Sequence, residues 1–233
     1  MIKLVRILTF ILAVVITVIS VFYVNAEREL AIAKSAYRRG DMDQALRKAR
    51  RANRALSDDD KKADAYYIQA RAASKMNWTK KAKDYLDELL VLDNEHIYGL
   101  LFRGEIALQL GQNENALRDL DKGITLASGK FNPNTLSYYL SKRGLAQLAL
   151  NQTNEAEVDA KEALKLSSNL AETHDLMSRV FEAKGDIKKA LEECEQAYQL
   201  SIEKDKMSFM TPEGKKLSNR LVDLKVKYLL SEK

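Results

Sequence analysis

The sequence predicts an all-α fold built from repeated helical hairpins, and three observations support this prediction. Its 233 residues include only two prolines, while alanine, leucine, lysine and glutamate dominate, which favours long helices. A content of 46% apolar and 30% charged residues is sufficient for a sizeable buried core. An alanine also recurs with similar flanking residues at near-constant intervals, which is the pattern of a repeat protein.

The first expected element is an apolar helix over residues 1–26. An uncharged run extends from Ile7 to Val24, and eighteen helical residues measure about 27 Å, close to the roughly 30 Å of a bilayer's hydrocarbon core. We therefore expect residues 4–24 to lie in the lipid bilayer as a transmembrane signal anchor. Lys3 and Arg6 precede the run, which predicts a single-pass protein of the inner (cytoplasmic) membrane with its domain on the periplasmic, extracytoplasmic side.

Two alternatives for this segment stay open. The basic start followed by Val24-Asn25-Ala26 also fits a signal peptide that is cleaved after Ala26, which would release the domain into the periplasm. The basic residues just beyond the run permit the opposite orientation, with a cytoplasmic domain; they are Arg28, Lys34, Arg38 and Arg39.

The rest of the chain repeats one pattern five times. An alanine stands near the start of each second helix, with spacings of 37, 34, 40 and 34 residues, at Ala45, Ala82, Ala116, Ala156 and Ala190. A small residue lies twelve positions earlier, where two helices must approach closely, namely Ala33, Ala70, Gly104, Gly144 and Ser178. Turn signals precede the alanines, at Gly40-Asp41, Asn77-Trp78, Gly111-Gln112, Asn151-Gln152 and Gly185-Asp186.

This pattern resembles the tetratricopeptide repeat family, most clearly from Leu101 to Leu120 and from Phe181 to Ala197. The resemblance implies a right-handed α-solenoid of about five helix-turn-helix repeats over residues 27–205. An insertion around Ser128, Phe131 and Pro133, expected to be an exposed loop, accounts for the spacing of 40.

A last helix is expected within residues 206–233, with Thr211 as its cap and Pro212 at its first position. Its apolar stripe should cover the final repeat, as stacked repeats need a terminal cap, and consists of Leu217, Leu221, Leu224 and Tyr228.

The chain shows no sign of enzymatic chemistry, so no catalytic residue, cofactor or metal site is expected. The two histidines, His96 and His174, lack a converging set of ligands, and glycines never form a phosphate-binding loop. Cys194 falls on an apolar helix register and should be buried and inert. Net charge is +5, and the basic cluster at residues 47–54 is interpreted as a solvated face, so no nucleic acid is expected.

The resemblance also implies that first helices line a concave groove where a protein partner binds. The groove-facing candidates form a mixed aromatic and charged set of the kind found in interfaces, although many of them are also suited to packing between repeats: Lys34, Tyr37, Tyr67, Arg71, Tyr98, Leu101, Glu105, Tyr138, Ser141, Leu145 and Arg179.

The function expected from these features is a membrane-tethered scaffold or adaptor that mediates protein-protein interactions during assembly of an envelope or membrane complex. One alternative is a structural, self-associating subunit of a larger membrane-associated assembly. The other is a cytoplasm-facing membrane receptor. The sequence does not name the partner, because one helical scaffold presents many different binding surfaces.

Overall fold

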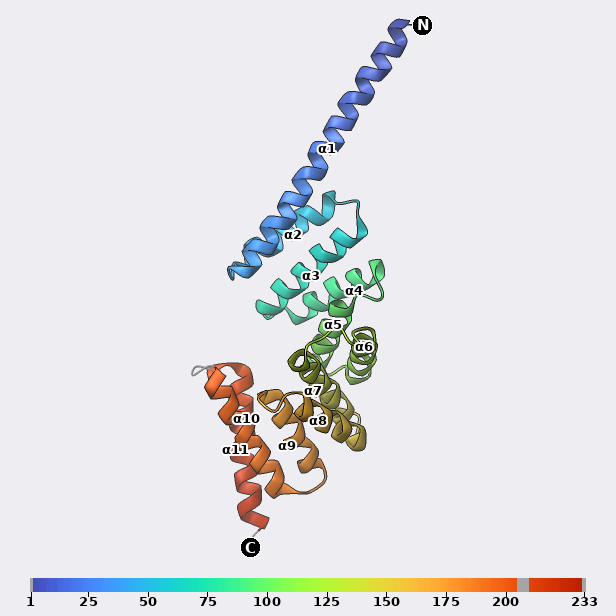
Figure 1. Ribbon diagram of the computed structural model, residues 1–233. Coiled ribbons are helices and arrows are strands. Elements are labelled where there is room, and N and C mark those ends of the chain that lie inside the picture. Colours follow the sequence, from blue (N-terminus) through green and yellow to red (C-terminus); the bar gives the residue numbers. More distant parts are fainter. Residues whose placement is uncertain (1, 205–209, 232–233) are drawn as a thin grey trace. The chain divides into compact units, whose positions relative to one another are not determined.

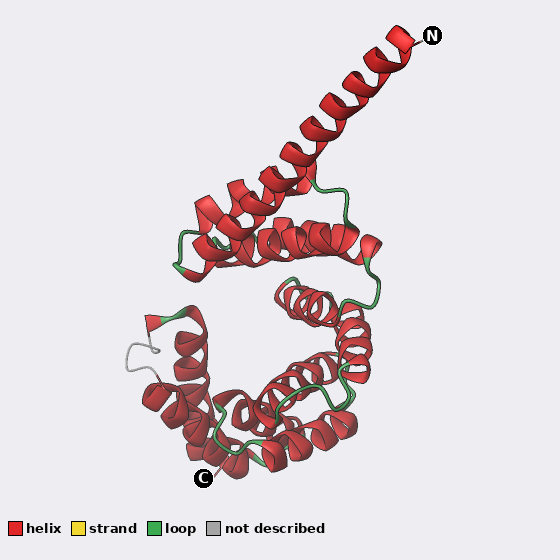
Figure 2. Cartoon of the chain, turned by 45° about the horizontal axis from the view of Figure 1, so that its top comes forward, coloured by secondary structure: helices red, strands yellow, loops and turns green. Residues whose placement is uncertain are grey.

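The computed structural model describes the backbone of residues 2–204 and 210–231, and their side chains except at residues 2–8, 18–23, 204, 212 and 213. Regular structure in this part of the chain is helical, as the sequence predicts, and contains no β-strand (Figure 2). The helices drawn in Figure 1 are α1 (Ile2–Arg38), α2 (Met42–Ala55), α3 (Asp59–Lys75), α4 (Thr79–Leu92), α5 (Ile97–Gln109), α6 (Asn113–Leu126), α7 (Pro133–Ala149), α8 (Thr153–Leu166), α9 (Ala171–Ala183), α10 (Ile187–Lys204) and α11 (Pro212–Ser231).

The chain divides into two compact units, Met1–Ile106 and Ala107–Lys233, and the boundary lies inside α5. In unit 1, α1 packs on α2, α2 on α3 and α3 on α4, and the first helices α1 and α3 also touch. In unit 2, the helices from α6 to α11 pack in chain order, and the first helices α7 and α9 touch. Each unit is therefore a stack of helical hairpins.

The five predicted hairpin turns share one geometry. The residue in the left-handed region, with φ between 60° and 84°, is Gly40, Asn77, Gly111, Asn151 or Gly185. The amide of the next residue donates to the carbonyl five positions back in every case, as from Asp41 to Ala36 at 3.0 Å and from Asp186 to Phe181 at 2.9 Å. This is the Schellman pattern, which ends a helix and reverses the chain. The predicted turns are confirmed.

Small residues hold the two helices of each hairpin together. The five recurring alanines predicted from the sequence have 0% exposure, and so do Ala33, Ala70 and Ser178. Ser178 donates through Oγ to the carbonyl of Ala190, at 2.6 Å, which joins the two helices of one hairpin at the predicted close contact. At Gly144 an added Cβ would lie 2.5 Å from a methyl carbon of Leu176 on α9, so there the close approach is to the next first helix. The close packing of the helices therefore depends on small side chains at these contact positions.

The repeat with a spacing of 40 contains a longer first helix as well as the expected loop. Residues 128–130, 132 and 133 are exposed, as predicted, but Phe131 is half-buried and stacks on Tyr139 at 5.8 Å. α7 has 17 residues where α5 and α9 have 13 each. Asn132 caps it by accepting from the amide of Thr135 at 2.9 Å.

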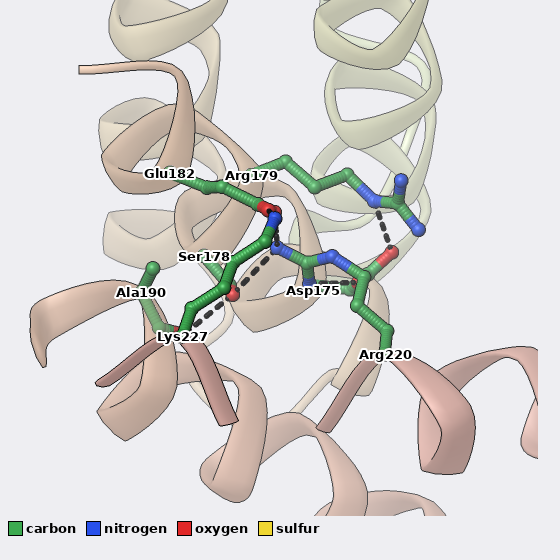
Figure 3. Close-up of polar contacts among 7 residues, drawn as sticks. All are labelled: Asp175, Ser178, Arg179, Glu182, Ala190, Arg220 and Lys227. Atoms are coloured by element: carbon green, nitrogen blue, oxygen red, sulfur yellow. Dashed lines mark hydrogen bonds and ion pairs between the residues drawn. The ribbon is translucent and has the colours of Figure 1, made fainter. Parts of the chain in front are cut away.

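The C-terminal helix packs on the last hairpin, as predicted. Thr211 Oγ1 accepts from the amide of Gly214 at 3.0 Å, and Leu224 is fully buried against Ala190 and Cys194. Arg220 reaches from α11 to α9, where it donates to Asp175 at 3.0 Å, Ser178 at 2.9 Å and Glu182 at 3.0 Å (Figure 3). The boundary expected between residues 205 and 206 lies outside the described residues.

The predicted membrane localisation is wrong for the part of the chain that the structure describes. There, no helix combines the length and the apolar character needed to cross a bilayer. The side chains of residues 2–8 and 18–23, which include Lys3, Arg6 and part of the expected span, lie outside the described residues. Ala26, the expected boundary, lies inside α1 and is 2% exposed in the core of unit 1.

The left-handed turns predict a test of the hairpin geometry. Gly185 has φ of 82° and no heavy atom within 4 Å of an added Cβ, so Gly185→Ala costs only backbone strain. We expect this variant to lose about 1 kcal/mol of unfolding free energy, measured by urea denaturation. Asn151→Gly is the matched control at φ of 61° and should change by less than about 0.5 kcal/mol. Equal losses in both variants would contradict this explanation.

His174 joins the last hairpin to the preceding loop. Its Nδ1 lies 2.7 Å from the Glu193 carboxylate on α10, and its Nε2 lies 2.9 Å from the Ser168 carbonyl. The Glu193 hydrogen bond raises the pKa of His174 above 6.5; burial opposes the shift, and the Ser168 carbonyl supports it. Because the pKa of His174 is raised in the folded protein, the contribution of the protonated His174 to the free energy of unfolding is complete below about pH 6.5. That contribution is lost as the pH rises through the folded-state pKa of His174.

We therefore predict that His174→Gln destabilises unit 2 more at about pH 5.5 than at about pH 9. The measurement is urea denaturation of both proteins across this range. Glu193→Gln removes the same ionic partner and should reduce the pH dependence in the same direction. If the difference between wild type and His174→Gln stayed constant with pH, the protonated pair would not be a source of stability.

Candidate protein-binding site

The first helices of unit 1 are connected by three polar contacts between α1 and α3. Lys61 donates to Glu27, Lys34 donates to Asp64 at 2.6 Å, and Arg71 donates to Tyr37 at 3.0 Å. Two of these contacts join residues 34 positions apart, which is the basic repeat spacing. The repeat therefore places equivalent faces of consecutive first helices beside each other.

The Arg71 cluster consists of Arg71, Tyr37, Tyr67, His96 and Phe102. Arg71 Nε donates to Tyr37 Oη at 3.0 Å, and Nη1 donates to Tyr67 Oη at 3.3 Å. The guanidinium lies over three rings, 5.6 Å from the centre of Tyr37, 5.9 Å from Tyr67 and 5.3 Å from Phe102. Tyr67 also meets Phe102 edge-on at 6.2 Å and His96 at 5.9 Å. The cluster thus draws on α1, α3, α5 and the loop before α5.

Arg71 carries a positive charge that no carboxylate of a described residue neutralises within 4.0 Å. Burial acts to lower the pKa of its guanidinium, but hydrogen bonding to Tyr37 and interactions with Tyr67 raise that pKa overall, so the charge is kept. Burial raises the pKa of Tyr67 against the opposing effect of Arg71, so the phenol stays neutral. Among the described residues, the guanidinium of Arg71 therefore contacts neutral phenol groups and the faces of aromatic rings.

Other partly buried arginines are neutralised within the chain. Arg103 is 22% exposed and pairs with Asp87 at 2.9 Å, and Arg220 pairs with two carboxylates of α9. Arg143 is 20% exposed and pairs with Asp159 at 2.6 Å and Asp121 at 2.8 Å. The ordinary arrangement in this fold is therefore an arginine held by carboxylates, and Arg71 departs from it.

The structure brings together three of the predicted site residues, Tyr37, Tyr67 and Arg71. Tyr98, on α5, is 51% exposed, and Glu105 is half-buried. Lys34 is half-buried and paired with Asp64, so its charge is already satisfied.

Two predicted site residues are excluded by burial. Leu101 and Ser141 both have 0% exposure, which leaves them no surface for a partner. Ser141 donates through Oγ to the Ser137 carbonyl of its own helix, at 2.9 Å. Leu145 is half-buried and packs against a core that includes Leu176, a packing role rather than an open surface.

The remaining candidates, Arg179 and Tyr138, belong to unit 2. Arg179 donates to Asp175 on its own helix at 3.0 Å, so its charge is met locally (Figure 3). Tyr138 lines a surface pocket with residues of α7 and α9.

Sequence reasoning missed Phe102 and His96. A signal for Phe102 was present, because it lies four residues after Tyr98 and therefore on the same face of α5. His96 precedes α5 and accepts from the amide of Gly99 at 2.9 Å, so it also caps that helix. No helical spacing predicts the orientation of such a residue.

The basic cluster on α2 is largely solvated. Arg47, Arg50, Arg51 and Arg54 are exposed, as expected for a solvated face. Arg50 also lies 5.6 Å from the ring centre of Tyr85 and donates to its hydroxyl. Lys48 is half-buried and pairs with Glu29 at 2.9 Å.

Neither cysteine nor histidine geometry points to a reactive centre in the described residues. Cys194 is free and fully buried, and burial raises the pKa of its thiol. Within the described part of the chain, no group of three or more metal-ligating side chains converges.

The comparisons with known proteins agree with this architecture. Residues 63–96 match the family model of the tetratricopeptide repeat, and they span most of α3 and all of α4. Comparison with curated protein sequences gives no match.

Three solved structures illustrate the likeness. A fragment of MamA from Desulfovibrio magneticus RS-1, residues 41 to the end, is 21% identical, with a TM-score of 0.65 over 78% of this chain and 97% of that fragment. A thermophilic tetratricopeptide repeat protein of Thermus thermophilus is 20% identical, with a TM-score of 0.57 over 86% and 99%. YrrB, described as a tetratricopeptide repeat protein with an unusual peptide-binding site, is 20% identical, with a TM-score of 0.61 over 81% and 90%.

At these identities the structural likeness establishes the fold alone, whereas the family model identifies a repeat in the sequence itself. Both agree with the shared turn geometry and the buried alanines of the five hairpins. The chain therefore contains a tetratricopeptide repeat at residues 63–96 and has the all-helical repeat fold of the tetratricopeptide repeat proteins.

Proposed function

We propose that this chain is a non-enzymatic protein-binding scaffold whose Arg71 cluster holds a partner segment through one of the partner's carboxylate groups. The observation that carries the proposal is the state of Arg71 itself. It is half-buried and charged, and it touches three aromatic rings without a carboxylate partner among the described residues. A fold that neutralises its other partly buried arginines leaves this one available to an external anion.

Physical chemistry favours a carboxylate as that anion. A guanidinium has five N–H donors in a planar fork that matches the two oxygens of a carboxylate. Arg71 uses Nε and Nη1 for the two phenols, and Nη2 donates no hydrogen bond within the described residues. Charge-assisted hydrogen bonds are stronger than neutral ones, especially where side chains exclude water.

The surroundings of Arg71 favour a protein segment over an isolated ion. Tyrosine and arginine recur at interface hot spots because they combine apolar contact area with polar tips. Tyr98 adds an exposed ring four residues before Phe102, so apolar surface is available beside the charge. YrrB, a protein of the same fold, is described as having a peptide-binding site, which supports a similar use of this chain.

The expected role in envelope assembly and the expected role as a membrane receptor both required the membrane anchor, so neither is part of the proposed function. The proposal concerns unit 1 alone, because the residues that carry it all lie within Met1–Ile106.

A random-peptide display selection on the full chain tests the proposal. We expect the wild-type protein to enrich peptides with an acidic residue or a free carboxyl terminus beside apolar residues. Arg71→Met removes the charge and keeps much of the apolar stem, so it should weaken binding of the selected peptides by about 30-fold or more, measured by calorimetry.

Arg51→Met is the matched control, because Arg51 is an exposed arginine of unit 1 outside the Arg71 cluster. It should leave peptide affinity unchanged. Thermal unfolding of both variants checks that the fold is kept. Selected peptides without carboxylate enrichment, or equal affinity for Arg71→Met, would rule out this mode of binding.

One observation favours a second candidate function, a self-associating scaffold. The outer face of α11 exposes four large apolar side chains at helical spacing, namely Val222 (58%), Val226 (51%), Leu229 (63%) and Leu230 (64%). Contiguous apolar stripes of this kind are typical of contact surfaces.

Light scattering over a range of concentrations tests self-association. If α11 mediates it, the mass of the wild-type chain should rise with concentration, and Val226→Glu combined with Leu229→Glu should keep the chain monomeric. Val158→Glu on α8 is the control, because Val158 is similarly exposed at 63% but isolated from the stripe. A wild-type protein that is monomeric at all concentrations would eliminate this candidate.

A further inference from the structure

A second candidate binding site lies in unit 2, where residues at the beginnings of α7 and α9 line an open pocket on the surface. The pocket has a volume of about 310 Å³ and is lined by Asn134, Thr135, Tyr138, Tyr139, Leu170 and Glu172. This volume is at the lower end of the range for ligand sites, about 300–1,000 Å³, so it admits one side chain or a small ion. Both helices belong to unit 2 and touch each other, so the pocket is defined within one unit.

Aromatic rings form one wall of the pocket. Tyr138 and Tyr139 meet edge-on, with ring centres 5.2 Å apart and an interplanar angle of 80°. Phe131, from the loop before α7, stacks on Tyr139 at 5.8 Å and fixes its orientation. The faces of such rings carry negative electrostatic potential and attract cations.

The Tyr138 ring already contacts one ammonium group of the chain. Lys142 is one turn beyond Tyr138 on α7, and its Nζ lies 4.8 Å from the centre of the Tyr138 ring. That distance is within the roughly 6 Å at which cation–π attraction is significant.

Glu172 supplies a negative charge to the same pocket. It lies in the first turn of α9, which begins without a side-chain cap. Its carboxylate is half-buried and makes no hydrogen bond or ion pair with the described residues. The other partly buried carboxylates of this helix, Asp175 and Glu182, are both held by Arg220. A carboxylate and aromatic faces in one small cavity form a site selective for an organic cation.

We propose that this pocket binds an alkylammonium group, as carried by a lysine side chain of a partner protein. The preference is opposite in charge to that of the Arg71 cluster, and it rests on different residues in the other unit. A lysine places a positive charge at the end of an apolar stem, which suits a cavity with an aromatic wall and a carboxylate. Binding at this pocket does not require Arg71, so an experiment can disprove one of the two proposals without disproving the other.

The experiment is an NMR titration of the full-length chain with N-acetyl-lysine methylamide. Ring resonances of Tyr138 and Tyr139, assigned with Tyr138→Phe and Tyr139→Phe, report binding at the pocket. We expect weak, saturable binding with a dissociation constant of about 30 mM, because an exposed cation–π contact and an exposed ion pair are each worth about 1 kcal/mol. N-acetyl-norleucine methylamide, which has the apolar stem without the charge, should not shift these resonances.

Two substitutions should change the affinity in opposite directions. Glu172→Gln removes the attracting charge and should weaken binding by about fivefold. Lys142→Met removes a competing cation from the same ring and should strengthen binding by about twofold. A purely structural role for these residues does not predict tighter binding in one of the variants.

Glu162→Gln is the matched control, because Glu162 is an exposed carboxylate of α8 outside the pocket, and it should bind the probe like the wild type. Arg71→Met should also keep the binding, which separates this site from the one in unit 1. Equal shifts with the norleucine probe, or unchanged affinity in Glu172→Gln, would overturn the ammonium site. Tighter binding of tetramethylammonium than of the lysine probe would overturn the assignment to a partner's lysine.

Discussion

The close approach of the two helices within each hairpin is the constraint on which the rest of the structure depends. The five recurring alanines are fully buried at these contacts, and a larger side chain there would force the helices apart. Because the hairpins are tight and similar, first helices of neighbouring hairpins touch within each unit, and side chains one repeat apart meet. The contact between Tyr37 and Arg71, 34 residues apart, follows directly from that spacing.

The same packing explains where binding chemistry can arise. Packed helices bring charged side chains together, and partly buried arginines find carboxylate partners, as Arg143 on α7 does with Asp159 on α8 and Asp121 on α6. A partly buried charge without an oppositely charged partner is the exception in this fold. Among the described residues, one such charge in unit 1 is the cation of Arg71, and one in unit 2 is the anion of Glu172, each beside aromatic rings. A scaffold with both has a physical basis for choosing partners by charge pattern.

Helical periodicity is informative about faces but weak about individual neighbours. Successive residues of a helix are rotated by about 100°, so two adjacent positions can face a core and a cluster. Leu101 and Phe102 illustrate this, because Leu101 was the predicted site residue but is fully buried, while Phe102 contacts Arg71. The helix α1 is another case, because a boundary was expected after Ala26, whereas the helix continues through that residue into the core of unit 1.

The sequence by itself determined the repeats, the turns and the terminal helix, because alanines, small residues and left-handed turn residues act locally and leave a periodic pattern. The resemblance to the tetratricopeptide repeat family placed Tyr37, Tyr67 and Arg71 among eleven groove-facing candidates. Only the tertiary structure decided that Arg71 has no carboxylate partner among the described residues, that Ser141 is buried and that Glu172 lines a pocket with Tyr138. Those facts depend on the angles at which helices cross and on which side chains from different helices come into contact. A periodic sequence pattern does not specify that geometry.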